Sequence, residues 1–267
     1  MSVQPAPVTV LCGFLGAGKS TLLKNILENS NSQYKFAVIV NDMASLNVDS
    51  AFIDASSMSR STEVVSMQNG CICCSLAGDL ADQITKLATT GKYDTIVIEA
   101  SGVSEPAGIT QLFLPPDESH DHSDHGHDHV HLSEVAHLDA TVTVIDSATF
   151  FDYFEGVGYM NNTPISKLLV EQIEFANVVI CNKLDLVSSA QRKRILEHVP
   201  LLNPTAKVLE ATKSSVNIGD VLFINAAAAS VSSEGVLNLL RSTTVKEKSE
   251  ELKSCCADSE AKTGKRC

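Results

Sequence analysis

A glycine-rich segment near the start of the chain ends in a lysine and a serine, a combination that can bind phosphate. The segment Gly13–Ser20 reads GFLGAGKS and matches the pattern G-x-x-x-x-G-K-[ST]. Glycines let backbone N–H groups turn inward around a β-phosphate, Lys19 reaches the β- and γ-phosphate oxygens, and the Ser20 hydroxyl ligates Mg²⁺. An apolar run precedes the motif and a helical pattern follows it, as a P-loop requires. The expected nucleotide contacts here are Gly13, Gly16, Ala17, Gly18, Lys19, Ser20 and Thr21.

A second motif, Asn182-Lys183-Leu184-Asp185, follows the apolar run Val178–Ile180 and suits guanine. The Asp185 carboxylate can accept hydrogen bonds from the N1–H and N2–H₂ groups of guanine, which adenine does not offer. Asn182 can bond to the base, and the Lys183 stem can pack over its ring. Because the motif follows both a P-loop and a strand, it favours GTP over ATP and argues against a small-molecule kinase.

The segment Glu99-Ala-Ser-Gly102 follows the apolar run Thr95–Ile98. An acid at the end of a central strand can hold a Mg²⁺-bound water, and a following glycine can approach the γ-phosphate. No glutamine directly follows Gly102 to position a water, so we expect slow hydrolysis. The residues expected to supply a mainly electrostatic catalysis are Lys19, Ser20 and Glu99.

Cys71, Cys73 and Cys74 lie within four residues, between a predicted strand and a predicted helix. Three thiolates at such a turn can converge on one soft ion such as Zn²⁺ or Cu⁺, and a helix N-terminus favours the thiolate form. They leave one tetrahedral position open, which suits metal transfer better than a permanent structural site. The alternatives are small buried thiols and a redox switch. Cys12 and Cys181, at the ends of apolar strands, are interpreted as core residues.

Six histidines alternate with aspartates in the low-complexity segment 114–132, which we interpret as a mobile loop. Neutral imidazole is a good ligand for zinc, nickel, cobalt and copper, but flexible spacing cannot enforce one geometry. We therefore expect several weakly held, exchangeable ions, and the alternative is a solvated polar loop. His137 is assigned to the same loop. The candidate ligands are His120, His122, His125, His127, His129 and His131.

Apolar runs alternate with helical patterns, which predicts an α/β fold of the P-loop NTPase type: a mostly parallel sheet with helices on both faces. The predicted strands are Val8–Leu11, Phe36–Val40, Glu63–Met67, Thr95–Ile98, Thr141–Ile145, Val178–Ile180 and Lys207–Leu209. The predicted helices are Ser20–Glu28, Leu76–Ala88, Ser166–Phe175 and Ala190–His198, and the runs Val216–Ala227 and Glu234–Leu240 close the ordered part. We expect one domain over 1–241 and a disordered charged tail over 242–267.

Acidic residues outnumber basic ones by 32 to 20 in 267 residues, and the formal net charge of −12 argues against nucleic-acid binding. The acidity is local, because residues 93–166 hold 13 acids, no lysine or arginine, and seven of the eight histidines. This stretch can attract cations. No apolar run is long enough to span a membrane and the start lacks a secretion signal, which together predict a cytoplasmic protein.

Four motifs together resemble the CobW-like GTPases, a metallochaperone family. They are the P-loop, Asn69-Gly-Cys-Ile-Cys-Cys74, Glu99-Ala-Ser-Gly102 with Ser104-Glu-Pro106, and Asn182-Lys-Leu-Asp185. The resemblance covers roughly residues 7–240 and implies slow GTP hydrolysis coupled to delivery of a metal, often zinc, to a client enzyme. Two features depart from the family pattern. Asp42, which the resemblance makes a candidate for holding metal or water, stands where many members have Glu. We also expect the chain to lack the family's usual C-terminal β-rich domain, which bears on client docking.

The leading hypothesis is a GTPase metallochaperone that uses GTP, Mg²⁺ and zinc, with cobalt, nickel and copper as alternative metals. Its expected partners are a client metalloprotein and, in a homodimer, a second copy of the chain, and either of these could complete the site. One alternative is a metal sensor or buffer, in which GTP only sets metal affinity. Another is a truncated regulatory form that binds partners but cannot deliver metal.

Overall fold

The computed structural model describes residues 4–30, 34–40, 62–66, 76–114, 131–156, 158–160 and 163–225. All of them belong to one compact unit, Met1–Ala228. Several predicted features lie outside the described residues and stay predictions. They are Asp42, Cys71, Cys73, Cys74, His120, His122, His125, His127, His129, the run Glu234–Leu240 and the tail 242–267.

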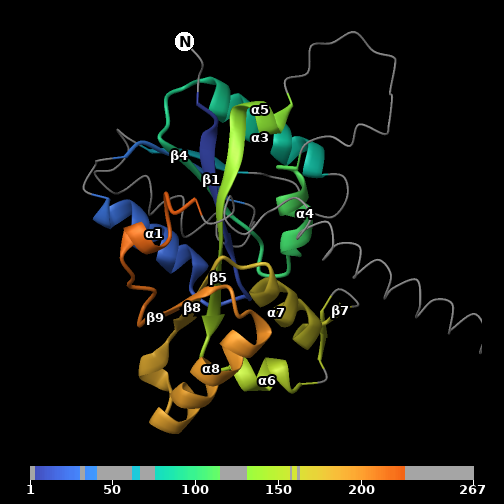
Figure 1. Ribbon diagram of the computed structural model, residues 1–267, viewed down its shortest axis with the longest axis vertical. Helices are drawn as coiled ribbons and strands as arrows, with labels where there is room; N and C mark the ends of the chain where they lie inside the picture. Colours follow the sequence, from blue (N-terminus) through green and yellow to red (C-terminus); the bar gives the residue numbers. More distant parts are fainter. Residues whose placement is uncertain are drawn as a thin grey trace, which may run out of the picture. The chain divides into compact units, whose positions relative to one another are not determined.

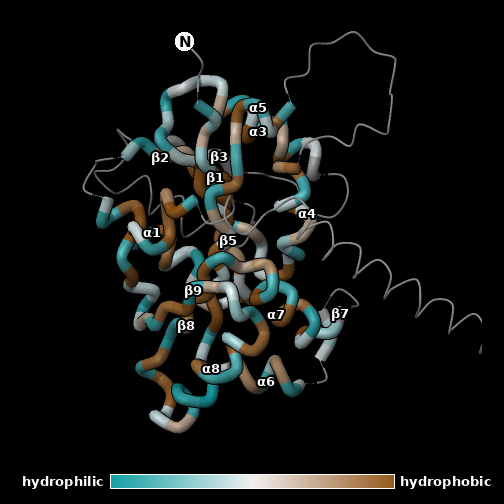
Figure 2. The backbone as a smooth tube through the Cα atoms, viewed as in Figure 1, coloured by the Kyte–Doolittle hydropathy of each residue, from teal (hydrophilic) through white to brown (hydrophobic). Residues whose placement is uncertain are grey.

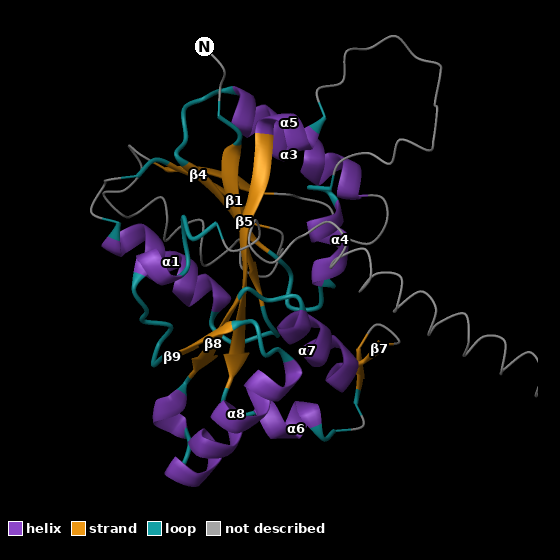
Figure 3. Cartoon of the chain, in the orientation of Figure 1, coloured by secondary structure: helices purple, strands orange, loops and turns teal. Residues whose placement is uncertain are grey.

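A seven-stranded parallel sheet forms the centre of the fold (Figures 1 and 3). Its strands are β1 (Ala6–Cys12), β2 (Phe36–Val40), β3 (Thr62–Ser66), β4 (Thr95–Glu99), β5 (Ala136–Asp146), β8 (Val178–Asn182) and β9 (Lys207–Glu210). The strand order is β3-β2-β4-β1-β5-β8-β9, and every pairing is parallel. Two short strands, β6 (Tyr159–Met160) and β7 (Thr163–Pro164), form a separate antiparallel pair. The predicted α/β class with a parallel sheet is confirmed.

Helices cover both faces of this sheet, which explains why its inner strands are mostly apolar. They are α1 (Lys19–Asn29), α3 (Leu76–Thr89), α4 (Pro106–Gln111), α5 (Leu132–Val135), α6 (Phe150–Phe154), α7 (Ile165–Glu174) and α8 (Ser189–Leu202). Helix α1 and the segment 216–224 pack on one face. On the other face, α3, α4 and α5 pack against β1, β2 and β4, while α6, α7 and α8 pack against β5 and β8. Figure 2 shows hydrophobic residues along the central strands and many polar residues on α8.

Strand β5 begins earlier than the predicted strand Thr141–Ile145. It pairs with β1 from Ala136 onward. His137 therefore lies on this strand and not in the histidine loop, and its Nδ1 is 3.1 Å from the carbonyl oxygen of Pro5. Polar residues at 137 and 139 interrupt the apolar pattern, and the pairing with β1 nevertheless extends through them. No helix in the described part of the chain is long and apolar enough to cross a membrane.

Candidate nucleotide site

Three predicted site segments meet at the carboxyl edge of the sheet. The P-loop follows β1, Glu99 ends β4 and Asn182 ends β8. Carboxyl ends of parallel strands share one edge, and ligands of such sheets bind there, where successive connections pass to opposite sides. Strand β1 occupies that position, between β4 and β5.

The P-loop curls tightly over the end of β1, and its glycines make this curl sterically feasible. Gly13, Gly16 and Gly18 have φ angles of 133°, 74° and 114°, which side-chain-bearing residues rarely adopt. A Cβ atom on Gly13 would lie 2.2 Å from the carbonyl oxygen of Val144, and one on Gly18 would lie 2.4 Å from Nδ2 of Asn182. The loop thus approaches both β5 and the end of β8 too closely for a side chain at either position.

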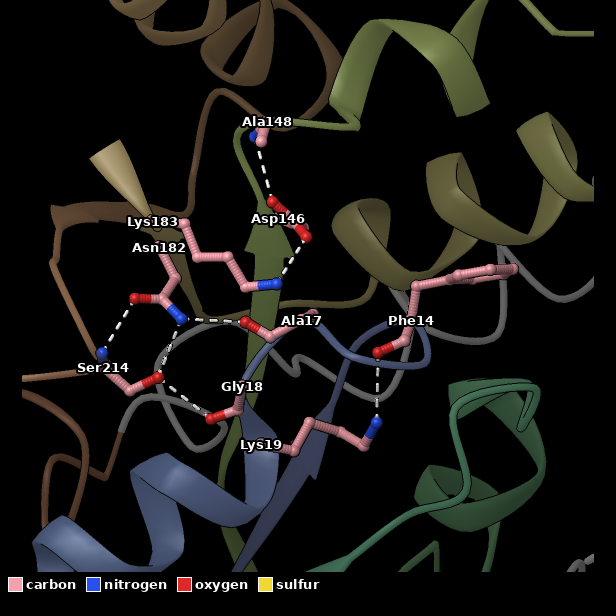
Figure 4. A network of polar contacts seen from close by, with 9 residues as sticks. All are labelled: Phe14, Ala17, Gly18, Lys19, Asp146, Ala148, Asn182, Lys183 and Ser214. Carbon is pink, nitrogen blue, oxygen red and sulfur yellow. Dashed lines mark hydrogen bonds and ion pairs between the residues drawn. The ribbon is translucent and has the colours of Figure 1, made fainter. Parts of the chain in front are cut away.

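Lys19 begins α1, and its side chain folds back into the curl of the P-loop (Figure 4). Its Nζ donates hydrogen bonds to the carbonyl oxygens of Gly13 at 2.9 Å and Phe14 at 3.2 Å, and the residue is only 7% exposed. A buried ammonium group of this kind is a strong partner for a phosphate oxygen. Of the neighbouring predicted contacts, Ala17 is buried and Thr21 is exposed.

Ser20 and Glu99, predicted from two separate motifs, touch each other. The Ser20 Oγ donates to Oε1 of Glu99 at 2.6 Å, and Glu99 is 3% exposed. Mg²⁺ prefers oxygen ligands and is typically bound by one or two of them from the protein, with waters and phosphate completing the shell. A hydroxyl and a buried carboxylate beside the phosphate loop fit that requirement. These two residues could hold Mg²⁺ between the protein and a nucleotide.

Gly102 lies against the P-loop, although about 80 residues separate it from that loop. A Cβ atom on Gly102 would be 2.7 Å from both the backbone nitrogen and the side chain of Leu15. The loop that follows Glu99 is therefore packed directly against the phosphate-binding segment. The contact predicted between Gly102 and the γ-phosphate stays a prediction, and the closeness of the two loops is compatible with it.

The buried side chain of Asn182 links the end of β8 to the P-loop and to Ser214 by hydrogen bonds (Figure 4). Its Nδ2 donates to the carbonyl oxygen of Ala17 at 2.8 Å and to Oγ of Ser214 at 2.9 Å, while its Oδ1 accepts from the backbone N–H of Ser214 at 2.8 Å. The residue is 2% exposed. The expected bond from Asn182 to the base stays a prediction. In this structure its amide fixes the P-loop relative to the guanine-type motif.

Lys183 and Asp185 occupy the surface side of the same motif. Lys183 has a positive φ of 62°, and its Nζ forms an ion pair with Oδ2 of Asp146 at 2.6 Å. Asp146 ends β5 and also accepts from the backbone N–H of Ala148 at 2.9 Å. Asp185 lies in the turn η1 (Leu184–Leu186) and is exposed, so its carboxylate is accessible to a base.

Ser214 belongs to this site and was missed by the sequence-based predictions. It is fully buried, has a positive φ of 53°, and its Oγ donates to the carbonyl oxygen of Gly18 at 2.9 Å. Asn25 of α1 donates to the carbonyl oxygens of Lys213 at 2.9 Å and Ser214 at 3.0 Å. The only available signal was the polar run after the predicted strand Lys207–Leu209, which occupies the same edge of the sheet as the other motifs.

Among the residues that the structure describes, no group of three or more metal-ligating side chains comes together. His131 is the one predicted histidine ligand within them. It precedes α5, and its Nδ1 accepts from the backbone N–H of Ser133 at 3.3 Å, so it caps that short helix. The cysteine turn and the other candidate histidines lie outside the described residues.

Cys12 and Cys181 are core residues, as predicted, and we expect them to resist alkylation. Both are buried, and burial raises the pKa of each thiol to about 12, although Lys19 partly opposes this for Cys12. At pH 8 neither forms the reactive thiolate. Brief iodoacetamide treatment followed by peptide mass spectrometry should leave both unmodified in the folded protein and modify both in denaturant. Rapid labelling of either one in the folded protein would contradict the described packing.

The arrangement of these motifs matches a known family. The sequence model of the CobW/HypB/UreG nucleotide-binding domain covers residues 7–210. The chain belongs to this family. The nucleotide-binding region of a CobW/HypB/UreG protein thus includes the P-loop, the Glu99–Gly102 loop and the Asn182–Asp185 motif described above.

Two characterised relatives of this CobW/HypB/UreG chain carry names that refer to zinc. Zinc-regulated GTPase metalloprotein activator 1 of Dictyostelium discoideum is 38% identical over an alignment of 266 residues, gaps included. The match covers 91% of this chain and 54% of that protein. The zinc chaperone CobW of Pseudomonas aeruginosa is 30% identical over 242 residues, covering 83% and 60%. This chain therefore spans little more than half the length of either relative.

The fold also resembles that of the signal recognition particle receptor FtsY from Elizabethkingia anophelis. That crystal structure has a TM-score of 0.50 and 13% sequence identity, and the match covers 84% of this chain and 63% of the other. At this identity the similarity extends to the fold alone.

Proposed function

We propose that this chain is a GTP-hydrolysing metallochaperone that binds zinc, or a similar transition metal, at Cys71, Cys73 and Cys74 and delivers it to a client protein. The observation that carries the nucleotide part is the contact between Ser20 and Glu99 at 2.6 Å, directly beside the buried Lys19. This contact places two oxygen ligands, from Ser20 and Glu99, and the ammonium group of Lys19 at the same end of the P-loop. Membership of the CobW/HypB/UreG family and the zinc-related names of its relatives support the metal part.

The phosphate chemistry rests on charge placement. Lys19 offers an ammonium group to the β- and γ-phosphate oxygens, and the P-loop N–H groups offer hydrogen bonds to the same charge. Ser20 and Glu99 would hold Mg²⁺, which, when bound, supplies further positive charge to the phosphates. Gly102 offers its backbone N–H to the γ-phosphate. Because these groups supply mainly electrostatic stabilisation and no glutamine directly follows Gly102 to position a water, we expect slow hydrolysis.

Guanine recognition rests on the exposed carboxylate of Asp185. Asn182 and Ser214 hold the motif against the P-loop, so the distance between the base-binding and phosphate-binding parts is fixed. This preorganisation lowers the cost of ordering the site when the nucleotide binds. GTP is therefore preferred over ATP.

The transition metal is assigned to residues other than these nucleotide contacts. The three thiolates of the Cys71–Cys74 turn form the tight site, and the histidines between 120 and 131 collect ions weakly. The loops around Asp42 and Gly102 respond to the γ-phosphate, and its loss alters the metal affinity of the thiolates. A metal sensor or buffer would share these features but would lack a client.

Measurement of GTP turnover with and without stoichiometric Zn²⁺ tests this coupling. We expect zinc to change the turnover number several-fold in the wild-type protein and to have no effect in Cys73→Ala, because the variant lacks one of three ligands. ATP should be hydrolysed far more slowly than GTP. Cys181→Ala is the matched control, because it removes a buried core thiol that is not among the proposed metal ligands and should keep the response to zinc.

An identical turnover with and without zinc in the wild-type protein would refute the coupling. So would a zinc response that persists in Cys73→Ala. Transfer of zinc to a purified apo-metalloprotein client, with GTP required, separates a chaperone from a buffer.

A further inference from the structure

One fully buried polar side chain lies next to the nucleotide site and has no part in the function proposed above. Gln172 is on α7, in line with the buried apolar residues Leu168, Leu169 and Ile173, and it is 0% exposed. A buried amide at such a position is costly unless it makes hydrogen bonds, so its contacts indicate what it is for.

The Gln172 amide reaches across to the loop that follows Glu99. Its Nε2 donates to the carbonyl oxygen of Ser104 at 3.2 Å and lies 3.5 Å from that of Gly102. Both neighbouring atoms are carbonyl oxygens, which only accept, so the nitrogen end of the amide must face the loop. The two N–H groups of one side chain thus hold two carbonyls of one loop.

The loop is confined on its other side by the P-loop. The hypothetical Cβ of Gly102 would lie 2.7 Å from the backbone nitrogen of Leu15, so the loop passes close to the P-loop and leaves no room for a side chain at this position. Gln172 itself is held in place, because the Thr143 Oγ1 of β5 donates to its backbone carbonyl oxygen at 2.6 Å. The Gly102–Ser104 loop therefore lies between a fixed amide and a fixed phosphate-binding segment.

The acceptor end of the same amide is unused. Among the described residues, Gln172 Oε1 is buried and has no hydrogen-bond partner. An unpaired buried acceptor raises the free energy of this arrangement.

We propose that Gln172 is a positioning residue that holds the Gly102–Ser104 loop where Gly102 meets the γ-phosphate, and that it thereby sets the preference for GTP over GDP. The proposal rests on the function proposed above. GDP lacks the γ-phosphate, so its binding does not depend on the position of this loop. GTP binding does.

The variant Gln172→Met keeps the length of the side chain and removes both the donor and the acceptor. We expect the affinity for a non-hydrolysable GTP analogue to fall about tenfold, the effect of losing two neutral hydrogen bonds. The affinity for GDP should change by less than about twofold, so the ratio of the two dissociation constants is the readout. Both are measured by titration with fluorescent nucleotide at a temperature at which the variant is folded.

Asn203→Leu is the matched control. Asn203 directly follows α8, and its buried amide contacts the carboxyl end of α7, the helix that carries Gln172. Asn203 Nδ2 donates to the carbonyl oxygens of Ile173, Glu174 and Ala176 at 2.8, 3.1 and 2.9 Å, and none of these belongs to the 102–104 loop. Both variants should lower the melting temperature. Only Gln172→Met should change the GTP-to-GDP ratio.

If Gln172→Met does not fold, Thr143→Val provides the same test. It preserves shape, removes the hydrogen bond to the backbone of Gln172, and should shift the ratio in the same direction by about threefold. An unchanged ratio in a folded variant overturns the role of Gln172 while GTP binding by the wild type stands. Failure of the wild type to bind either nucleotide overturns both proposals.

Discussion

Lys19→Ala is expected to lower the affinity for GTP by roughly 30- to 4,000-fold. Truncating one partner of a buried, hydrogen-bonded charge pair costs about 2–5 kcal/mol, and each 1.4 kcal/mol corresponds to a tenfold change. Lys19 is 7% exposed and is oriented by the carbonyl oxygens of Gly13 and Phe14, so its charge is little screened by water. Titration with fluorescent GTP measures the effect, and a thermal melt of the same sample verifies that the variant is folded.

The control for this prediction is Lys24→Ala on the same helix. The Lys24 side chain is 43% exposed, and its Nζ lies 3.8 Å from Oε1 of Glu28, one turn further along α1. Exposed pairs of this kind contribute about 0–1 kcal/mol, so the substitution should leave GTP affinity unchanged. Equal losses of affinity in both variants would mean that Lys19 acts through general positive charge and not through a phosphate contact.

The second large effect is expected for Gly13→Ala, which should destabilise the folded protein by about 3 kcal/mol or more. The new Cβ would lie 2.2 Å from the carbonyl oxygen of Val144 on the buried strand β5, and φ at this position is 133°. Neither the strand nor the loop can move without disturbing the centre of the sheet. Because about 1 kcal/mol corresponds to a change of about 2–4 °C in a protein of this size, the melting temperature should fall by roughly 6–12 °C or more.

Gly16→Ala separates the steric clash from backbone strain. Gly16 has a φ of 74°, but no heavy atom lies within 4 Å of its hypothetical Cβ. The expected cost is therefore the strain alone, about 1–2 kcal/mol. A melting temperature for Gly13→Ala that equals that of Gly16→Ala would show that the loop does not approach β5 as closely as described.

The features that the sequence predicts best depend on local patterns. The apolar runs of β1, β2, β4 and β8 are recognisable because each strand is buried on both faces. The P-loop is recognisable because glycine, lysine and serine must follow one another within a few residues. The contact between Ser20 and Glu99 could be anticipated as well, because both follow strands that end at the same edge of the sheet.

The features that were missed depend on contacts between distant segments. Ser214 bonds to Gly18, which lies 196 positions earlier in the chain, and no local pattern marks such a pair. Asn182 carries a recognisable motif, but its buried partners in the P-loop are not apparent from that motif. Gln172 gave one unused signal, since it is a polar residue in the otherwise apolar buried stripe of α7.

The beginning of β5 was also missed, for a different reason. Its first residues include the polar His137 and Asp139. Because they follow the histidine-rich segment closely, the sequence pattern assigns His137 to that segment and predicts a strand that begins only at Thr141. Asp139 is nevertheless buried, and it accepts hydrogen bonds from the Thr9 hydroxyl at 3.3 Å and the backbone N–H of Asn225 at 2.7 Å. A satisfied buried carboxylate can occupy a strand that hydropathy alone does not indicate.

Metal analysis of the GTP-loaded protein tests the central proposal most directly. After passage over a weak chelator, the wild-type protein should retain about one zinc ion per chain, as a thiolate site with three protein ligands would. A variant with Cys71, Cys73 and Cys74 replaced by serine should retain none. Deletion of 117–130, which stops short of α5, should spare this tightly bound ion and remove only weakly held metal. Full retention of zinc by the serine variant, or its loss on deletion of 117–130, would contradict the assignment of the metal to the cysteines.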